Sequence, residues 1–200
     1  MTTFYLIRHA EKDAVEGVLA GRTPGIALSA RGLRQAEALA RHLRGERIDA
    51  VFSSPIQRAQ ETAAAIARDR GLGVELCDPI TEVEFGEWTG ASFSAVAPQE
   101  RWRRFNTFRS GTPIPGGESA LAVQARFVSE MLRLRAARPG GGVALVSHAD
   151  PIRLALAYFL GTPIDLCLRL EVDLASVSVV ALHDDAATIR RLNDVAAENV

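Results

Sequence analysis

Two histidines in this 200-residue chain stand directly after short apolar runs that are typical of buried β-strands. His9 follows residues 4–7 and Arg8, and His148 follows residues 143–147. The carboxyl ends of parallel strands meet at one edge of an open α/β sheet, and such folds bind their ligands there. We therefore expect both imidazoles and the guanidinium of Arg8 to share one site, with a chemistry suited to a phosphate group.

Phosphoryl transfer requires positive charge around the phosphoryl oxygens, an in-line nucleophile and a proton for the leaving oxygen. His9 can be the nucleophile, because a neutral imidazole keeps one lone pair near pH 7. Arg8, Arg58 and His148 are expected to form a cationic cluster around the phosphate, since Arg58 lies one helical turn beyond the end of a second predicted strand. Glu82 lies in an irregular segment, where partial burial beside a phosphate would raise its pKa and make it the proton donor.

The other histidines have structural explanations. His42 falls on the expected outer face of a helix and His183 at the end of a predicted hairpin, so we expect both near the surface. A metal site formed by His148 and Asp150 is disfavoured, because the sequence supplies no third ligand beside them. We expect neither a metal ion nor a dissociable cofactor.

Strands and helices that alternate along the chain must position these side chains. Apolar runs bounded by turn residues predict the strands, while serine or proline at the start and glycine at the end delimit the helices. Strands are expected at residues 4–8, 50–53, 74–76 and 143–147, followed by a hairpin of residues 176–183 and 188–192. Helices are expected at residues 29–44, 54–70, 119–138 and 150–161, and a glycine-rich loop at residues 14–27.

Apolar faces predict how two of these helices pack. In the helix capped by Ser29, the face consists of Ala36, Leu39, Ala40 and Leu43. In the long helix after Ser119, the expected stripe is Leu121, Ala125, Val128 and Leu132. Ser54 and Pro55 are expected to cap and open the helix of residues 54–70, whose positive end would then point toward the site.

Residues 78–117 are the least regular part of the chain. They contain an expected helix in which Trp102 and Phe105 face inward, at i and i+3. The arginines around them are expected in water, although a role in substrate binding is the alternative; they are Arg101, Arg103, Arg104 and Arg109. In either case this segment could cap the crevice and shape its specificity.

Composition limits the class of protein. A chain of 200 residues with 48% hydrophobic and 24% charged residues fits one globular domain with a substantial core. The net charge of −1 gives no indication of nucleic acid or an anionic membrane as a partner. Lys12 is the only lysine beside 22 arginines, a bias that we attribute to genome composition.

Cysteine usage and hydropathy favour the cytoplasm. Cys77 and Cys167 show neither metal-ligand spacing nor a disulfide framework. No apolar stretch approaches the roughly 20 residues that span a bilayer. Charged residues from Arg8 onward leave no room for the core of a signal peptide.

Five blocks of residues, in order along the chain, resemble the successive motifs of one family. They are residues 6–11 (LIRHAE), 53–62 (SSPIQRAQET), 82–90 (EVEFGEWTG), 116–119 (GGES) and 146–148 (VSH). This ordered set resembles the histidine phosphatase superfamily, in its phosphoglycerate mutase-like branch, from about residue 3 to residue 183. The resemblance implies an α/β fold, a three-layer sandwich with a mainly parallel central sheet. It also implies a single domain of residues 1–200, with a helical insertion at about 84–117 over the carboxyl-terminal strand ends.

The resemblance assigns a role to each candidate residue. His9 would be the phosphorylated nucleophile, and Glu82 would act as acid and base. The phosphate pocket would consist of Arg8, Arg58 and His148. Arg22, in a segment that borders the pocket, would bind substrate. Motif position alone selects Glu82 over the neighbouring carboxylates.

Three positions depart from the family pattern. Ala10 and Ala149 stand where the family usually has glycine after each active-site histidine, and a methyl group is tolerated there unless the backbone needs a positive φ. Lys12 stands where a threonine is common, so a hydroxyl contact is lost or is supplied by another residue. These changes bear on the shape of the pocket.

The expected activity is that of a phosphomonoester hydrolase, a histidine acid phosphatase-type enzyme. It would act on a small phosphorylated metabolite through a phosphohistidine intermediate. The alternatives are a phosphoglycerate mutase, which returns the phosphoryl group to a second hydroxyl, a protein phosphohistidine phosphatase and a non-catalytic anion-binding module. The expected partner is a small-molecule phosphate ester, without nucleic acid or membrane, and a homodimer is possible.

Overall fold

The computed structural model describes residues 1–13 and 17–196, and a six-stranded sheet runs through this part of the chain. Its strands are β1 (Thr2–Arg8), β2 (Ala50–Ser53), β3 (Val74–Leu76), β4 (Gly142–Ser147), β5 (Ser176–Leu182) and β6 (Ala187–Val195). The order is β3-β2-β4-β1-β5-β6. The first four strands in this order are parallel, and β5 and β6 continue the sheet as an antiparallel hairpin. The predicted mainly parallel sheet is therefore confirmed.

The neighbouring strands β1 and β4 bring the two histidines to one edge. Arg8 pairs with Ser147 in the parallel register, so His9 and His148 are the next residues on adjacent strands. Both strands consist largely of buried apolar residues, since helices cover both faces of the sheet. The register of this one strand pair fixes the distance between the two imidazoles.

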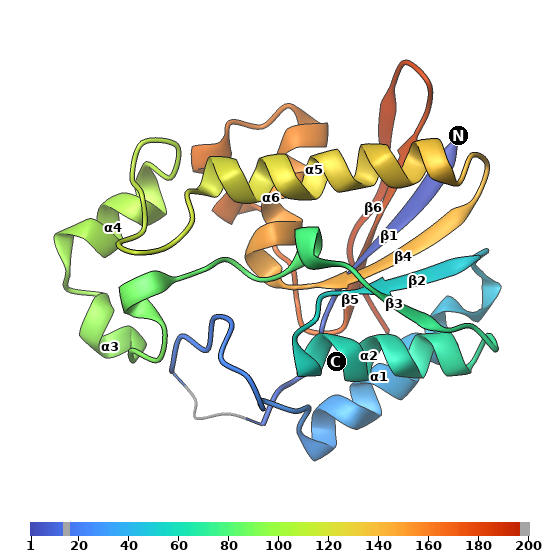
Figure 1. Cartoon of the computed structure of the whole chain (residues 1–200), viewed down its shortest axis with the longest axis horizontal. Helices are drawn as coiled ribbons and strands as arrows, with labels where there is room; N and C mark the ends of the chain where they lie inside the picture. The colour runs from blue at the N-terminus through green and yellow to red at the C-terminus, as the bar shows by residue number, and fades with distance from the viewer. Residues whose placement is uncertain (14–16, 197–200) are drawn as a thin grey trace.

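Helices on both faces complete the three layers (Figure 1). α1 (Ala30–His42) and α2 (Gln57–Arg68) share a core with Tyr5 and Ile7 of β1. α5 (Ala120–Ala137) and α6 (Ala149–Leu160) share the opposite core with Phe4 and Leu6. Alternate residues of one strand thus face opposite helical layers, as the period of a strand requires. Short 3₁₀ helices lie at Leu43–Gly45, Asp78–Ile80, Gly86–Trp88 and Ile164–Arg169.

The apolar face predicted for α1 is confirmed, and the one predicted for α5 is correct only at Val128, which is buried. Ser29 accepts the Gly32 N–H at 2.9 Å as the cap of α1, and the predicted face of that helix is buried. In α5, by contrast, Leu121 and Leu132 are 50% and 45% exposed. The stripe buried there instead is Val123, Phe127, Met131 and Leu134. Apolar residues occur on both sides of this helix. The side that faces the core is the one with Phe127 and Met131, because the burial of these larger side chains removes more apolar surface from water.

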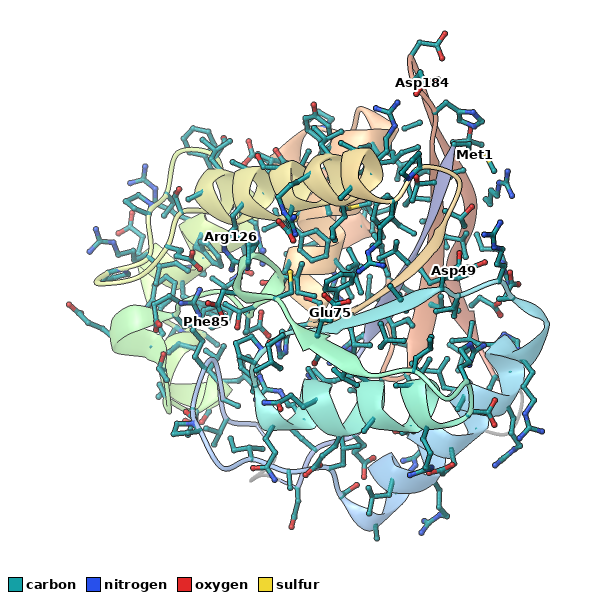
Figure 2. The ribbon with its side chains drawn as sticks, turned by 45° about the vertical axis from the view of Figure 1, so that its right-hand side comes forward. Met1, Asp49, Glu75, Phe85, Arg126 and Asp184 are labelled. Atoms are coloured by element: carbon teal, nitrogen blue, oxygen red, sulfur yellow. The ribbon has the colours of Figure 1, made fainter. Side chains whose placement is uncertain are left out.

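A helical excursion of residues 84–117 lies beyond the carboxyl ends of the parallel strands (Figure 1). It contains α3 (Phe93–Val96) and α4 (Glu100–Thr107). Trp102 and Phe105 face inward as predicted, with ring centroids 5.1 Å and 5.6 Å from that of Trp88. Backbone hydrogen bonds from Glu87 to Pro115 and from Glu118 to Glu84 close the base of the excursion. The hairpin of β5 and β6 projects on the opposite side, with Asp184 at its tip (Figure 2).

The predicted loop of residues 14–27 is only partly visible, because residues 14–16 lie outside the described residues. The described part is tied to the rest of the fold by a bridge between Val18 and Ser92 and by another between Lys12 and Leu28. No helix in the described ranges is both long enough and apolar enough to cross a membrane.

Gly32 gives a test of how α1 packs near the active-site strand. A Cβ atom at this position would lie 1.9 Å from the carbonyl oxygen of Glu11, a backbone atom that cannot rotate away. We expect Gly32→Ala to lower the free energy of unfolding by about 2 kcal/mol, measured by urea denaturation. Gly73→Ala is the matched control, since a Cβ there meets nothing within 4 Å. Equal losses in the two variants would contradict the packing of α1 on this backbone.

Candidate active site

The structure brings the predicted site residues together around one cavity. Arg8, His9, Arg58 and Glu82 line a space of about 720 Å³. The ring centroids of His9 and His148 lie 5.1 Å apart, with the planes inclined by 62°. The Glu82 Oε2 atom lies 3.8 Å from the Nδ1 atom of His148. Five side chains that span more than two thirds of the chain thus meet at the carboxyl edge of the sheet.

Backbone contacts hold His9 rigidly after β1. Its N–H donates to the carbonyl of Ser147 at 3.0 Å, which extends the ladder to β4 by one residue. The next N–H, that of Ala10, donates to the Thr62 Oγ1 atom at 3.1 Å. The Thr62 hydroxyl in turn donates to the carbonyl of Arg58 at 2.8 Å. The nucleophile candidate and the arginine beside it are therefore fixed relative to each other through α2.

Two hydrogen bonds define the tautomer of His9. The Nδ1 atom lies 2.7 Å from the carbonyl oxygen of Ala10, a group that can only accept, so Nδ1 carries the proton. The Arg58 Nε–H donates to the Nε2 atom at 3.2 Å, which therefore holds the lone pair. Burial and the positive charge of Arg58 lower the pKa of His9 well below its usual value. His9 is thus neutral, with its nucleophilic nitrogen oriented toward the cavity-lining guanidinium.

His148 lies beside His9 and Arg58, but its surroundings do not favour the positive charge expected from the sequence. Burial and the neighbouring His9 and Arg58 lower its pKa well below the usual value. Its Nε2 atom lies 2.8 Å from the Ser54 hydroxyl, and its Nδ1 atom lies 3.4 Å from the Arg58 Nη2 atom. The positive charge of the site comes from the arginines.

Ser54 does not cap α2, contrary to the sequence-based expectation. The helix begins at Gln57, with Ile56 as its cap, and Ser54 remains in the extended segment after β2. Its hydroxyl contacts His148 and lies 3.2 Å from the Thr81 hydroxyl. The residue that looked like a helix cap therefore orients one of the two imidazoles.

Buried donors of the two arginines remain available for an anion. Within the described residues, neither the Arg8 Nε atom nor the Arg58 Nη1 atom has a hydrogen-bond partner, and both atoms are buried. Their other nitrogens are held: Arg8 Nη1 donates to the carbonyl of Val172 at 2.7 Å and Arg58 Nη2 to that of Gly21 at 2.8 Å. An unsatisfied buried donor is costly, and an anion in the cavity would satisfy both.

Glu82 has the properties of a proton donor near neutral pH. Burial raises its pKa to about 7, and the negative charge of Asp150 acts in the same direction. The N–H of Val83 donates to its Oε1 atom at 2.9 Å and holds the carboxyl group in place. At pH 7 about half of the molecules therefore carry a proton on this group.

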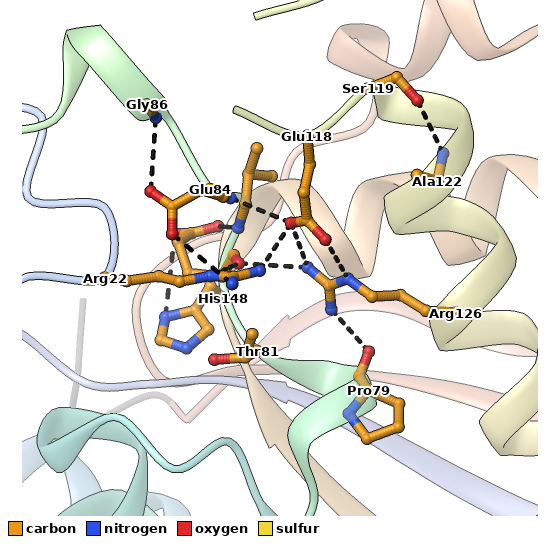
Figure 3. Close-up of polar contacts among 12 residues, drawn as sticks. Arg22, Pro79, Thr81, Glu84, Gly86, Glu118, Ser119, Ala122, Arg126 and His148 are labelled. Atoms are coloured by element: carbon orange, nitrogen blue, oxygen red, sulfur yellow. Dashed lines mark hydrogen bonds and ion pairs between the residues drawn. The ribbon is translucent and has the colours of Figure 1, made fainter. Parts of the chain in front are cut away.

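The backbone of Glu82 is held by an ion-pair network centred on Glu118 (Figure 3). The Glu118 carboxylate accepts from Arg22 Nη2 at 2.6 Å and from Arg126 Nε at 3.0 Å. Both arginines also donate to the carbonyl of Glu82, at 2.8 Å and 3.1 Å. The side chain of Arg22 is thus bound to Glu118 and to the backbone of Glu82. This placement does not support the substrate contact expected from the sequence.

Arg109 is buried, contrary to the expectation that the arginines around α4 lie in water. Its side chain is 3% exposed and donates to Asp150 at 3.0 Å, while its guanidinium lies 4.5 Å from the ring centroid of Phe105. Arg153 donates to the other oxygen of Asp150 at 3.1 Å. Both oxygens of the Asp150 carboxylate thus accept hydrogen bonds from arginines. This carboxylate is therefore not free to bind a metal ion together with His148. The excursion therefore contributes a charged group to the cavity wall.

Alanine at the two positions where the family usually has glycine is compatible with the backbone of the site. In the described part of the chain, Ala175 and Asn193 are the non-glycine residues with positive φ, so neither Ala10 nor Ala149 needs the conformation that favours glycine. Ala149 begins α6 and lines the cavity.

Sequence reasoning missed Thr62 as part of the site. It considered Asp150 only as a disfavoured metal ligand, and Arg109 only for the alternative role in substrate binding. Thr62 lies inside a quoted motif, four residues after Arg58, and that helical spacing could have shown that its hydroxyl reaches the Arg58 carbonyl. The pairing of Arg109 with Asp150 had no signal in the sequence, because 41 residues separate the partners.

Comparison with known proteins agrees with this geometry. A model of the histidine phosphatase superfamily (branch 1) matches residues 4–195. The chain is 38% identical to the bifunctional protein Rv2228c of Mycobacterium tuberculosis over 96% of its own length, and it spans 53% of that relative. It is 32% identical to phosphoserine phosphatase 1 of Hydrogenobacter thermophilus, with 96% of this chain and 92% of the relative covered.

A solved structure shares the fold over almost its whole length. It is a phosphoserine phosphatase variant from Entamoeba histolytica in complex with phosphoserine, and it superposes with a TM-score of 0.87 at 25% identity. The alignment covers 96% of this chain and 97% of that structure. Together with the family match over residues 4–195, these likenesses place the chain in the histidine phosphatase superfamily, branch 1.

Proposed function

We propose that this chain hydrolyses phosphate monoesters through a phosphohistidine at residue 9. The observation that carries the proposal is the neutral His9 Nε2 atom, which lies in a cavity beside two unpartnered arginine donors and an acid with a pKa of about 7. Nucleophile, anion clamp and proton donor are the three components that the reaction needs. We also propose that residues 1–200 act as one domain with this single site.

The first step transfers the phosphoryl group to His9. The Arg8 Nε and Arg58 Nη1 donors bind phosphoryl oxygens, and Arg58 Nε releases the lone pair of the imidazole as it turns to the anion. A bond forms between Nε2 and phosphorus while the bond from phosphorus to the ester oxygen breaks. The proton of Glu82 moves to that oxygen, so the leaving group departs as a neutral alcohol. His148, whose ring centroid lies 5.1 Å from that of His9, completes the phosphate pocket in this scheme.

The second step returns the enzyme to its starting state. Glu82 is now a carboxylate and accepts a proton from a water molecule that attacks phosphorus. The bond between phosphorus and Nε2 breaks, inorganic phosphate leaves, and Glu82 carries a proton again. The ion-pair network of Glu118, Arg22 and Arg126 keeps the Glu82 backbone in place for both steps, so we assign Arg22 a positioning role.

The proposed substrate is a small phosphorylated metabolite. A cavity of about 720 Å³ has the size of a site for such a molecule. The phosphoserine phosphatases among the similar proteins support this class. Because Glu82 must carry a proton to act, we also propose that the activity is higher at acidic than at alkaline pH, as in a histidine acid phosphatase-type enzyme. A cytoplasmic location and a homodimer stay predictions from the sequence.

A substitution of His9 tests the proposed nucleophile. We expect His9→Ala to reduce phosphate release from 4-nitrophenyl phosphate to the background rate, because the attacking lone pair is lost. His42→Ala is the matched control, since His42 pairs with Asp194 outside the cavity. Wild-type turnover in His9→Ala would contradict the proposal. With 3-phosphoglycerate as the substrate, formation of 2-phosphoglycerate in place of free phosphate would indicate a mutase, and phosphate binding without turnover would indicate a binding module.

The pH dependence of kcat/KM tests the role of Glu82. With an alkyl phosphate, kcat/KM should fall as the pH rises through about 7, because the proton donor is lost above its pKa. Asp150→Asn removes a negative charge that raises this pKa, so the alkaline limb should move to lower pH. Asp185→Asn, an exposed change in the hairpin turn, should leave the limb in place. A limb that stays in place or moves to higher pH in Asp150→Asn would assign the proton transfer to another group.

A further inference from the structure

Lys12 occupies a fixed position at the wall of the cavity. Its backbone forms a bridge with Leu28, and the carbonyl of the preceding Glu11 accepts from Ser29 at 3.0 Å. The N–H of Glu11 donates to the Gln35 side chain at 2.9 Å. Three contacts on one short segment thus direct Lys12 into the lining that it shares with Arg8, His9, Arg58 and Glu82.

The ammonium group of Lys12 has no partner of its own. Its side chain is partly buried, and within the described residues it makes neither a hydrogen bond nor an ion pair. Burial and the guanidinium groups of Arg58 and Arg8 lower its pKa, while the carboxylate of Glu82 acts in the opposite direction. A partly desolvated cation without a counter-charge is unfavourable until an anion reaches it.

The exposed carboxylate of Asp13 also lines the cavity, but it is not among the groups that shift the pKa of Lys12. The other charged groups in the lining are matched. The dianionic phosphoryl group of a substrate balances Arg8 and Arg58, and Glu82 is uncharged when it carries the proton for the leaving group. Asp150 is shared by Arg109 and Arg153. The carboxylate of Glu11 accepts from the Ser29 hydroxyl at 2.7 Å and pairs with Arg31 outside the cavity. The positive charge of Lys12 therefore remains when a simple phosphate monoester is bound.

The side chain of Lys12 is suited to bind a substrate group whose position differs from one phosphate ester to another. Arg8 and Arg58 are held by backbone carbonyls and present fixed donors, as a phosphoryl group requires. Lys12 carries a compact charge on a flexible stem of four carbons. It is also the only lysine in a chain that otherwise uses arginine for every basic side chain. Such a group can follow the part of the substrate that differs from one phosphate ester to another.

We propose that Lys12 binds a second anionic group, a carboxylate or a second phosphate, on the leaving-group side of the substrate. The inference rests on the proposed phosphatase function and narrows its substrate class to phosphate esters with more than one anionic group. Lys12 acts in this scheme as a specificity-determining residue, because the transferred phosphoryl group already has its own donors.

A matched pair of substrates tests the inference. Phosphoglycolate and 2-hydroxyethyl phosphate differ only in a carboxylate that is replaced by a hydroxymethyl group. We expect wild-type protein to favour phosphoglycolate in kcat/KM, and Lys12→Gln to lower this preference by about tenfold or more, the worth of one hydrogen bond to a charged group. Lys12→Arg should retain most of the preference. Arg34→Gln, which removes the same charge from the exposed face of α1, should leave the preference at the wild-type value.

A binding measurement separates this inference from the proposed reaction. In the His9→Ala background, calorimetry should show tighter binding of phosphoglycolate than of 2-hydroxyethyl phosphate, and Lys12→Gln should remove the difference. That result without turnover in the wild type would support the second-anion site and overturn the phosphatase. Turnover with an unchanged preference in Lys12→Gln would overturn the role of Lys12 and leave the phosphatase standing.

Discussion

The guanidinium of Arg58 is the group on which the rest of the site depends. It is 1% exposed, and it contacts both imidazoles with nitrogens 3.2 Å and 3.4 Å from them. A permanent charge this deeply buried needs polar partners, and it finds them in His9, His148 and the carbonyl of Gly21. Burial lowers the pKa of both histidines, and the charge of Arg58 acts in the same direction, so the nucleophile stays neutral. Among the described residues, the buried Nη1 donor of Arg58 has no hydrogen-bond partner. An anion bound in the cavity would satisfy this donor.

The fold supplies the low-dielectric surroundings that make this arrangement work. Parallel pairing of β1 with β4 sets the spacing of the imidazoles, and α2 delivers Arg58 between them. The network of Glu118, Arg22 and Arg126 anchors the segment that carries Glu82. The carboxylate of Asp150 raises the pKa of Glu82 and also binds Arg109, a residue of the excursion. It therefore links the proton donor electrostatically to the excursion. Chemistry at the strand ends is thereby connected to the segment that shapes the cavity.

Much of this could be predicted from the sequence, for identifiable reasons. Apolar runs that end in histidine predict strands and their functional edge, since the carboxyl edge of a parallel sheet is a property of the architecture. The sequence-based predictions failed where two alternatives had equally strong signals in the sequence. Both sides of α5 are apolar, so periodicity alone did not choose the inner face. Ser54 followed by proline has the local features of a helix start, but its hydroxyl accepts from the N–H of Ile56 and contacts His148, and the helix begins only at Gln57. Pairings over a long sequence distance, such as Arg109 with Asp150, leave no local trace.

The central claim is that the lone pair of the His9 Nε2 atom attacks phosphorus. Rapid quenching of the reaction with a ³²P-labelled substrate, followed by alkaline digestion and separation of the two phosphohistidine isomers, tests this claim most directly. We expect an acid-labile, alkali-stable adduct at residue 9 with phosphorus on Nε2, because Nδ1 donates its proton to the carbonyl of Ala10. An adduct on Nδ1, an adduct on another residue, or turnover without any phosphoenzyme would contradict it.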